Sequence, residues 1–342
     1  MADADTKLVA DADLTHCNSL RVAGRARFLA ALASASAVPE WLADPRFAGL
    51  PVLVLGAGSN VLLTGDFPGL VLQLKTADIR LVADDGERVT VRAEAGVCWQ
   101  DLVQWSLAQG LVGLENLSLI PGSCGAAPIQ NIGAYGVELS DHLEAVEVWD
   151  RQQQHWHTLP RADCALAYRD SCFKRQPGRY IVTAIRLRLA RSAALHLDYA
   201  GLREELLAMQ VASADAASVA QAVVRLRQRK LPDPAQLPNA GSFFKNPLVT
   251  SSDAAALAAR HPALPQWPQS DGRVKLSAAW LIEHIGGKGS RHGDAGIAPG
   301  HALVLVNYGR ASGLELLAFA RSLQNRVEAA FQVRLEPEPV II

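Results

Sequence analysis

A short polar segment, Asn239 to Pro247, combines residue types that suit proton chemistry. It reads Asn-Ala-Gly-Ser-Phe-Phe-Lys-Asn-Pro, so one hydroxyl, that of Ser242, follows a glycine and precedes two phenylalanines. Glycine lets a backbone pass close to a ligand. Aromatic side chains can exclude water, which strengthens charge and proton chemistry at a hydroxyl. The segment therefore predicts a small polar site with an apolar wall.

A second segment has the composition of a phosphate-binding loop and consists of Gly56, Ala57, Gly58, Ser59 and Asn60. The third glycine of a dinucleotide-binding G-x-G-x-x-G fingerprint would fall at position 61, which is a valine. The residues that follow predict a strand, whereas a Rossmann unit binds pyrophosphate at a helix N-terminus. We therefore do not expect a Rossmann unit. A strand–loop–strand turn can still hold phosphate through successive backbone N–H groups, and a simple hairpin turn is the alternative.

The longest unusual segment runs from Ile120 to Gly136 and contains four glycines, two prolines and no charged residue. It is too apolar for a solvated loop and too rich in glycine for the interior of a helix or strand. Such a backbone suits close contact with a large flat ligand whose edge is read by main-chain groups. A flavin ring fits that description. A buried irregular core loop is the alternative.

Single residues elsewhere carry further candidate chemistry. Neither Ser123 nor Ser242 lies in the G-x-S-x-G pattern of a hydrolase, so Ser242 is better suited to giving a proton to a carbanion. Arg169 could bind a substrate carboxylate bidentately, since its charge is permanent; a solvated or ion-paired surface arginine is the alternative. His284, His292 and His301 lack metal-ligand spacing, and we expect no metal site.

Glu338 lies near the end of the sequence, where a charged residue is usually solvated. Its neighbours Pro337 and Pro339, and the apolar residues 340–342, make the surroundings stiff and apolar. This composition predicts a terminus that is docked on the fold.

The apolar patterns predict an α+β chain. Strands are expected at 51–55 (buried), 61–63, 89–93, 143–149, 180–189 and 333–336. Helices are expected at 99–109, 216–229, 277–285 and 312–331. Strands dominate before about residue 190 and helices afterwards, so we expect two or three compact units.

Composition narrows the function classes. With 342 residues, 49% of them hydrophobic, and a net charge of −1, the chain has enough apolar residues for a large core and no basic excess for nucleic acid. No apolar run reaches the roughly 18 residues of a membrane helix. The polar, acidic first residues do not resemble a signal peptide. Five cysteines without a C-x-x-C pattern predict free thiols in a reducing cytoplasm.

Together these motifs resemble the UDP-N-acetylenolpyruvoylglucosamine reductases, flavoenzymes of peptidoglycan-precursor synthesis, and the resemblance covers essentially the whole chain. They occur in the family's order: 56–60 as the first flavin-phosphate loop, 121–139 as the flavin-embracing segment, 168–171 as the catalytic arginine motif, 230–234 and 239–247 as the substrate-domain signature, and 335–338 as the catalytic glutamate motif. Residues 197–199, followed by an insertion before Lys230, are similar to the class in which a mobile tyrosine loop closes over the substrate.

The resemblance implies an α+β architecture with an FAD-binding fold of the vanillyl-alcohol-oxidase/PCMH type and a separate α+β substrate-binding domain. The implied boundaries are 1–75 with 332–342 for FAD-binding subdomain 1, 76–218 for FAD-binding subdomain 2, which includes the tyrosine loop, and 219–331 for the substrate-binding domain.

The resemblance also implies a reaction, in which hydride passes from NADPH to non-covalently bound FAD and then to the enolpyruvyl ether of UDP-N-acetylglucosamine, giving UDP-N-acetylmuramate. The implied catalytic residues are Arg169, which offsets developing negative charge, Ser242, which gives a proton, and Glu338, which orients or protonates. The implied substrate-binding residues are Tyr199, Lys230 and Asn246. The implied FAD contacts are Gly56, Ala57, Gly58, Ser59, Asn60, Gly122, Gly125, Ile129, Gln130, Asn131 and Gly133. We expect a cytoplasmic monomer that binds neither nucleic acid nor membrane.

One departure from the family pattern concerns the glutamate motif. The family usually continues with Val-Arg, whereas here Pro339 and Val340 follow Glu338 and the sequence ends at Ile342. A proline favours an extended conformation at the residue before it. Two other functions stay open on the sequence alone: a different flavin oxidase or dehydrogenase on the same scaffold, and a non-catalytic module that binds nucleotide sugar or flavin.

Overall fold

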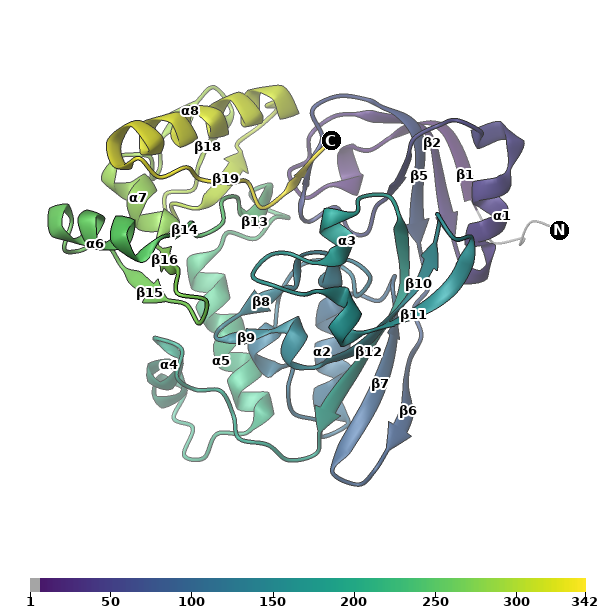
Figure 1. Ribbon diagram of the computed structural model, residues 1–342, viewed down its shortest axis with the longest axis horizontal. Helices are drawn as coiled ribbons and strands as arrows, with labels where there is room; N and C mark the ends of the chain where they lie inside the picture. Colours follow the sequence, from purple (N-terminus) through teal and green to yellow (C-terminus); the bar gives the residue numbers. More distant parts are fainter. Residues whose placement is uncertain (1–6) are drawn as a thin grey trace. The chain divides into compact units, whose positions relative to one another are not determined.

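The computed structural model describes residues 7–342 and divides them into two compact units, whose elements can be followed in Figure 1. The first unit comprises residues 7–12, 26–57 and 67–229, and the second comprises 13–25, 58–66 and 230–342. Two short N-terminal segments thus belong to the unit that contains the C-terminal third of the chain. The acidic residues 1–6 lie outside the described residues. The three-part domain division implied by the family resemblance remains a prediction.

A five-stranded antiparallel sheet forms the centre of the first unit. Its strand order is β11 (His155–Pro160), β10 (Leu143–Asp150), β12 (Tyr180–Ala190), β7 (Arg88–Glu94) and β6 (Ile79–Asp84). In β12 the apolar Ile185, Leu187 and Leu189 are buried whereas Arg188 is exposed, which confirms the predicted alternation. Helix α2 (Trp99–Ala108) shares one hydrophobic core with the sheet, and the predicted glycine stop, Gly110, has a φ of 69°.

A second, four-stranded sheet in this unit contains parallel strands. Its order is β1 (Lys7–Asp13), β2 (Arg25–Leu32), β5 (Phe67–Leu74) and β3 (Val52–Val54), with β5 parallel to both β2 and β3. Helix α1 (Val38–Ala43) supplies Val38 and Trp41 to its core. The strand predicted at 51–55 exists as β3, but the prediction that it is buried was wrong, because β3 lies at the sheet edge and Val54 is 40% exposed.

The first unit contains three more α-helices among its described residues. They are α3 (Cys172–Arg175), α4 (Leu202–Ala208) and α5 (Ala216–Lys230), and a short hairpin joins β8 (Gly133–Ala134) to β9 (Val137–Glu138). The apolar face predicted for α5 is confirmed, since Val219, Ala222, Val223 and Leu226 are buried in one cluster with Leu202 and Leu206 of α4. No sequence signal predicted α4.

Two larger sheets and three α-helices form most of the second unit, which also contains the two-stranded C-terminal sheet described below. One sheet has the order β13 (Asn239–Ser242), β19 (Val304–Asn307), β18 (Ala295–Ile297) and β17 (Arg291–His292), and the other has the order β14 (Leu248–Val249), β16 (Val274–Leu276) and β15 (Gln266–Pro268). The helices are α6 (Ser251–Arg260), α7 (Ala278–His284) and α8 (Gly313–Phe331). The predicted capping box of α8 is confirmed, because the Ser312 hydroxyl and the Glu315 carboxylate each accept the other residue's backbone N–H.

The C-terminal strand lies later in the chain than the sequence predicts. Residues 333–336 form no strand, whereas β20 (Val340–Ile341) pairs in parallel with β4 (Val61–Leu62). The N–H of Val340 donates to the Asn60 carbonyl at 3.0 Å and that of Ile342 to the Leu62 carbonyl at 2.9 Å. Because Pro337 and Pro339 have no N–H to donate, a regular ladder begins only beyond them. The predicted docking of the terminus is confirmed.

Among residues 7–342, the structure contains no helix with the length and apolar character needed to cross a bilayer. All five cysteines are free thiols. Within the same residues, His, Cys, Asp and Glu side chains do not gather in groups of three that could hold a metal ion.

Candidate active site

Ser242 is the last residue of β13 and pairs with Val304 of β19. The preceding Gly241 has a φ of 69°, a left-handed conformation that a residue with a Cβ adopts only with strain. The side chains of Phe243 and Phe244 are fully buried, with ring centroids 5.1 Å apart. A glycine turn and two buried rings therefore fix the position of a half-buried hydroxyl.

The glutamate motif lies beside this serine motif within the second unit. The N–H of Glu338 donates to the carbonyl oxygen of Phe243 at 2.8 Å, and Phe244 forms a bridge with Pro337. The side-chain amide of Asn60 donates to the Glu338 carbonyl at 3.4 Å. Three motifs that are distant in sequence, those of Asn60, Ser242 and Glu338, thus come together.

The two polar residues implied to bind substrate, Lys230 and Asn246, belong to the same unit. The Asn246 side-chain oxygen accepts the N–H of Ala278 at the start of α7, at 3.0 Å. Lys230 is exposed at the end of α5, and together with burial its charge lowers the pKa of His301. His301 therefore lies near a cation, although the sequence did not mark it as a site residue.

In the first unit, the arginine motif is tied to the long glycine-rich segment. The Arg169 guanidinium donates to the Gly133 carbonyl at 3.0 Å, and the Ser171 hydroxyl donates to the Ile129 carbonyl at 2.6 Å. Arg169 itself is half-buried and has a φ of 53°. The arginine is thus held by a strained turn against residues 129–133.

The sequence of segment 120–136 left open two interpretations, a backbone that contacts a flat ligand and a buried core loop, and the structure has features of both. Cys124 and Ala127 are buried in the core shared with α2, whereas Ile129, Gln130 and Gly133 remain half-buried. The side-chain amide of Asn131 donates hydrogen bonds to the Glu138 carboxylate at 2.8 Å and to the Ala167 carbonyl oxygen at 3.2 Å. One side of the segment therefore belongs to the core, and the other presents backbone groups.

The first loop lies against this segment. A Cβ added at Gly56 would lie 2.5 Å from the Ser123 hydroxyl oxygen, so Gly56 packs closely against the Ser123 side chain. Next in the loop, Gly58 is buried, and among residues 7–342 its N–H has no hydrogen-bond acceptor. A phosphate oxygen would satisfy a buried donor of this kind. The loop therefore fits the phosphate of a flavin nucleotide.

The structure also gathers side chains that the sequence did not mark. The ring of Tyr199 packs edge-on against that of Tyr135, with centroids 4.9 Å apart. Arg227 of α5 lies near both rings and near Arg169. Burial and the nearby Arg169 charge lower the pKa of the Arg227 guanidinium, and they outweigh the two tyrosines, which act to raise it. Arg227 follows the buried Val223 by four residues, so the sequence signal for it was a cation on the buried side of α5.

The curated protein UDP-N-acetylenolpyruvoylglucosamine reductase of Xanthomonas oryzae pv. oryzae (strain KACC10331 / KXO85) is 54% identical over 332 residues, which cover 97% of this chain and 98% of the relative. The chain belongs to this reductase family. The reductase of Xanthomonas axonopodis pv. citri (strain 306) is 52% identical over 98% of this chain and 96% of its own length.

Two family domains and one solved structure agree with this assignment. Residues 233–342 match the C-terminal domain of UDP-N-acetylenolpyruvoylglucosamine reductase, and residues 26–158 match an FAD-binding domain. The crystal structure of the reductase from Thermus caldophilus has a TM-score of 0.67, with 27% identity and 98% of each chain covered. The reductase family therefore accounts for the α+β fold, with its FAD-binding domain of the PCMH type.

Proposed function

We propose that this chain uses NADPH to reduce the enolpyruvyl ether of UDP-N-acetylglucosamine to UDP-N-acetylmuramate, a step in peptidoglycan-precursor synthesis. The 54% identity to a reductase of that name over 97% of the chain supports the proposal. The structural observation that carries it is the hydrogen bond of 2.8 Å between the Glu338 N–H and the Phe243 carbonyl, since it joins the segments of Ser242 and Glu338.

We propose that the FAD is held by residues 56–60 and by the half-buried side of residues 120–136. An FAD held there would supply the hydride chemistry that links NADPH to the methylene carbon of the enolpyruvyl group. The buried N–H of Gly58 supports the phosphate contact, and the half-buried residues Ile129, Gln130 and Gly133 support contact with the ring edge.

Ser242 is the proposed proton donor. Hydride addition leaves a carbanion next to the substrate carboxylate, and that carbon must take one proton to complete the D-lactyl ether. A neutral hydroxyl can give this proton because the acceptor is strongly basic for only a short time. The backbone turn at Gly241 and the buried Phe243 hold the hydroxyl in one direction.

Arg169 and Glu338 are proposed to manage charge around that carbon. The guanidinium of Arg169 offsets the added negative charge on the carboxylate, and its bond to Gly133 fixes the direction of the cation. Glu338 orients the intermediate or shares in its protonation.

Tyr199, Lys230 and Asn246 are proposed to bind the UDP diphosphate and nucleotide, with lysine as a point cation and the others as hydrogen-bonding groups. We also propose the tyrosine-loop class for this chain. A cytoplasmic monomer is part of the same proposal, and reducing conditions would keep its five cysteines as thiols.

Absorbance spectroscopy of the purified protein tests the proposal. We expect a yellow protein whose flavin is bleached anaerobically by NADPH and regains its colour on addition of the UDP-linked enolpyruvyl sugar. Rapid recovery with oxygen and indifference to the UDP sugar would indicate a different flavin oxidase. Binding of UDP ligands without any turnover would indicate a non-catalytic module.

A further inference from the structure

The segment that carries Tyr199 is attached to the first unit at both ends. Residues 196–205, here named the tyrosine segment, begin at His196, whose carbonyl accepts the side-chain amide of Asn116 at 2.9 Å. The same amide donates to the Tyr135 carbonyl at 2.9 Å, and Asn116 is only 1% exposed. At its start, therefore, the tyrosine segment is linked to the residue against which the Tyr199 ring packs.

The other end of the tyrosine segment is a buried carboxylate. Glu205, on α4, is 3% exposed and forms ion pairs with Arg225 (3.2 Å) and with Arg229, both on α5. Leu202 and Leu206 of the same helix pack into an apolar cluster with α5. A buried carboxylate is costly unless it is paired, and an apolar residue would often pack there as well or better. The ion pairs therefore call for a role other than stability.

The packing of α4 on α5 affects how Tyr199, just before α4, lies relative to Arg227 of α5. Arg227 lies between the two paired arginines in sequence, and among the described residues its buried Nε has no hydrogen-bond acceptor. Electrostatic interactions link Arg227 to Tyr135, Tyr199 and Arg169. A sliding or lifting of α4 on α5 would move Tyr199 relative to this group.

We propose that Glu205 is a positioning residue for Tyr199: its ion pairs with Arg225 and Arg229 hold α4 on α5, so that Tyr199 stays beside Tyr135 at the substrate site. This inference rests on the proposed function, because the role of Tyr199 in substrate binding comes from it. Glu205 itself touches neither substrate nor flavin in this account.

Helix α4 contains a matched control. Glu204 precedes Glu205 directly and its side chain is exposed. An exposed charge contributes little to holding a structure together. Glu204→Gln therefore removes one negative charge from the same helix without releasing α4.

The test is steady-state kinetics of Glu205→Gln and Glu204→Gln with the UDP-linked enolpyruvyl sugar at saturating NADPH. For Glu205→Gln we expect the KM for the sugar to rise about tenfold, because displaced contact groups weaken binding. Flavin reduction by NADPH and kcat should stay within about threefold of wild type. Glu204→Gln should keep the wild-type KM, and Glu205→Asp should recover part of the loss.

Removal of a negative charge near cations would by itself strengthen the binding of an anionic substrate. A lower KM in Glu205→Gln, or an unchanged KM with only a lower Tm, would therefore overturn the inference. If Glu205→Gln does not fold, Arg229→Lys keeps the charge and loses the guanidinium that donates to the Glu205 carboxylate. We expect its KM to rise about threefold, and an unchanged KM would again overturn the inference. If the UDP sugar does not reoxidise the wild-type flavin, the proposed function fails instead.

Discussion

The backbone N–H of Glu338 donates a hydrogen bond of 2.8 Å to the carbonyl oxygen of Phe243, the residue that follows Ser242. It is one of several contacts between the two segments, since the Lys245 N–H also donates to the Glu336 carbonyl at 3.0 Å. Pro339 follows directly, and the chain then pairs with β4. The glutamate motif thus lies beside the serine motif in this chain, although Pro339 replaces the valine that the family usually has there.

Glu338→Gln should slow flavin reoxidation by the UDP sugar about 100-fold, because the variant keeps the backbone contact and loses the acid or orienting charge. Glu336→Gln is the matched control. Glu336 lies two residues away, is 71% exposed and forms an ion pair with Lys245. Stopped-flow absorbance of the reduced protein gives both rates, and equal rates in the two variants would remove Glu338 from the catalytic group.

Gly313→Ala should lower the free energy of unfolding by about 3 kcal/mol, because overpacked backbone must shift. A Cβ at Gly313 would lie 1.6 Å from the carbonyl oxygen of Leu63, at the point where α8 begins against β4. Gly300→Ala is the control, since a Cβ there would meet no atom within 4 Å. Urea unfolding of the two variants measures the difference, and similar midpoints would contradict the packing described for Gly313.

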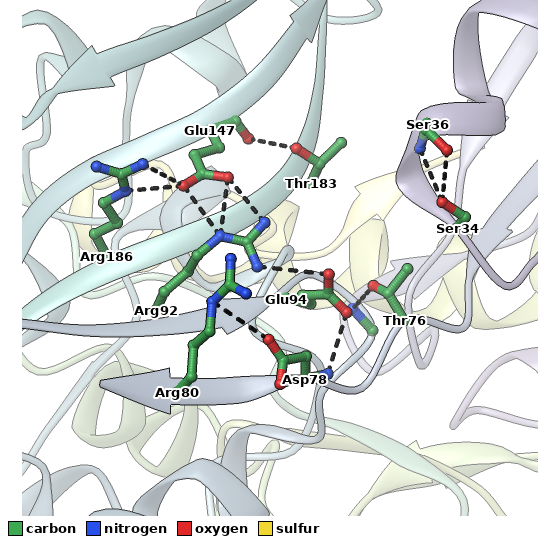
Figure 2. A network of polar contacts seen from close by, with 11 residues as sticks. Ser34, Ser36, Thr76, Asp78, Arg80, Arg92, Glu94, Glu147, Thr183 and Arg186 are labelled. Carbon is green, nitrogen blue, oxygen red and sulfur yellow. Dashed lines mark hydrogen bonds and ion pairs between the residues drawn. The ribbon is translucent and has the colours of Figure 1, made fainter. Parts of the chain in front are cut away.

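Glu147 should make stability depend on pH. Figure 2 shows its carboxylate between Arg92 and Arg186, at 2.9 and 2.8 Å. Burial acts to raise the pKa of Glu147, but hydrogen bonds from the two arginines outweigh burial and lower it below its usual value. A carboxyl with a lowered folded pKa stabilises the fold above its unfolded pKa of about 4.3, and this contribution is lost as the pH falls through the folded pKa.

Glu147→Gln should therefore cost about 2 kcal/mol of unfolding free energy at pH 7, and the cost should shrink steadily below about pH 4. Asp78→Asn, which breaks the exposed pair with Arg80 in the same network, should cost less than about 1 kcal/mol. Urea unfolding between pH 3 and 7 measures both. A cost for Glu147→Gln that did not change with pH would argue against the charged pair as its source.

Cysteine reactivity should follow burial. Burial, with smaller contributions from Cys172 and Asp163, raises the pKa of the Cys164 thiol to about 12. At pH 8 only about one Cys164 in ten thousand would be a thiolate, which is the reactive form. We expect Cys164 and the buried Cys124 to resist a thiol-specific reagent until urea unfolds the protein, whereas the exposed Cys98 is accessible. Rapid labelling of Cys164 in the native protein, located by mass spectrometry, would contradict the packing.

Local sequence signals predicted the helices well, but they predicted poorly the strand pairing and ion pairs that join distant parts of the chain. The apolar period of α5 and the capping box at Ser312 involve residues only a few positions apart, so the local sequence is enough to predict these two helices. The strand predicted at 333–336 was wrong because apolar alternation does not reveal which strand is free to pair with the C-terminal residues. In the structure that partner strand is β4, which pairs with β20. The role of Glu205 also depends on distant arginines of another helix, which no short motif encodes.

For the candidate site too, the sequence predicted the local segments but not the contacts between distant residues. The segments of Ser242, Arg169 and residues 120–136 were predicted from composition and from the family's order of motifs. The sequence did not predict that Arg169 has a φ of 53° and bonds to Gly133, nor that Arg227 lies near Tyr199. Contacts of this kind depend on tertiary packing, which overrides local preference.

Anaerobic stopped-flow absorbance of Ser242→Ala tests the central claim most directly, because it separates the two half-reactions. We expect NADPH to reduce the variant's flavin at the wild-type rate, whereas reoxidation by the UDP-linked enolpyruvyl sugar should slow by at least about 100-fold. Reoxidation at the wild-type rate, or loss of both half-reactions together, would contradict the assignment of Ser242 as the proton donor.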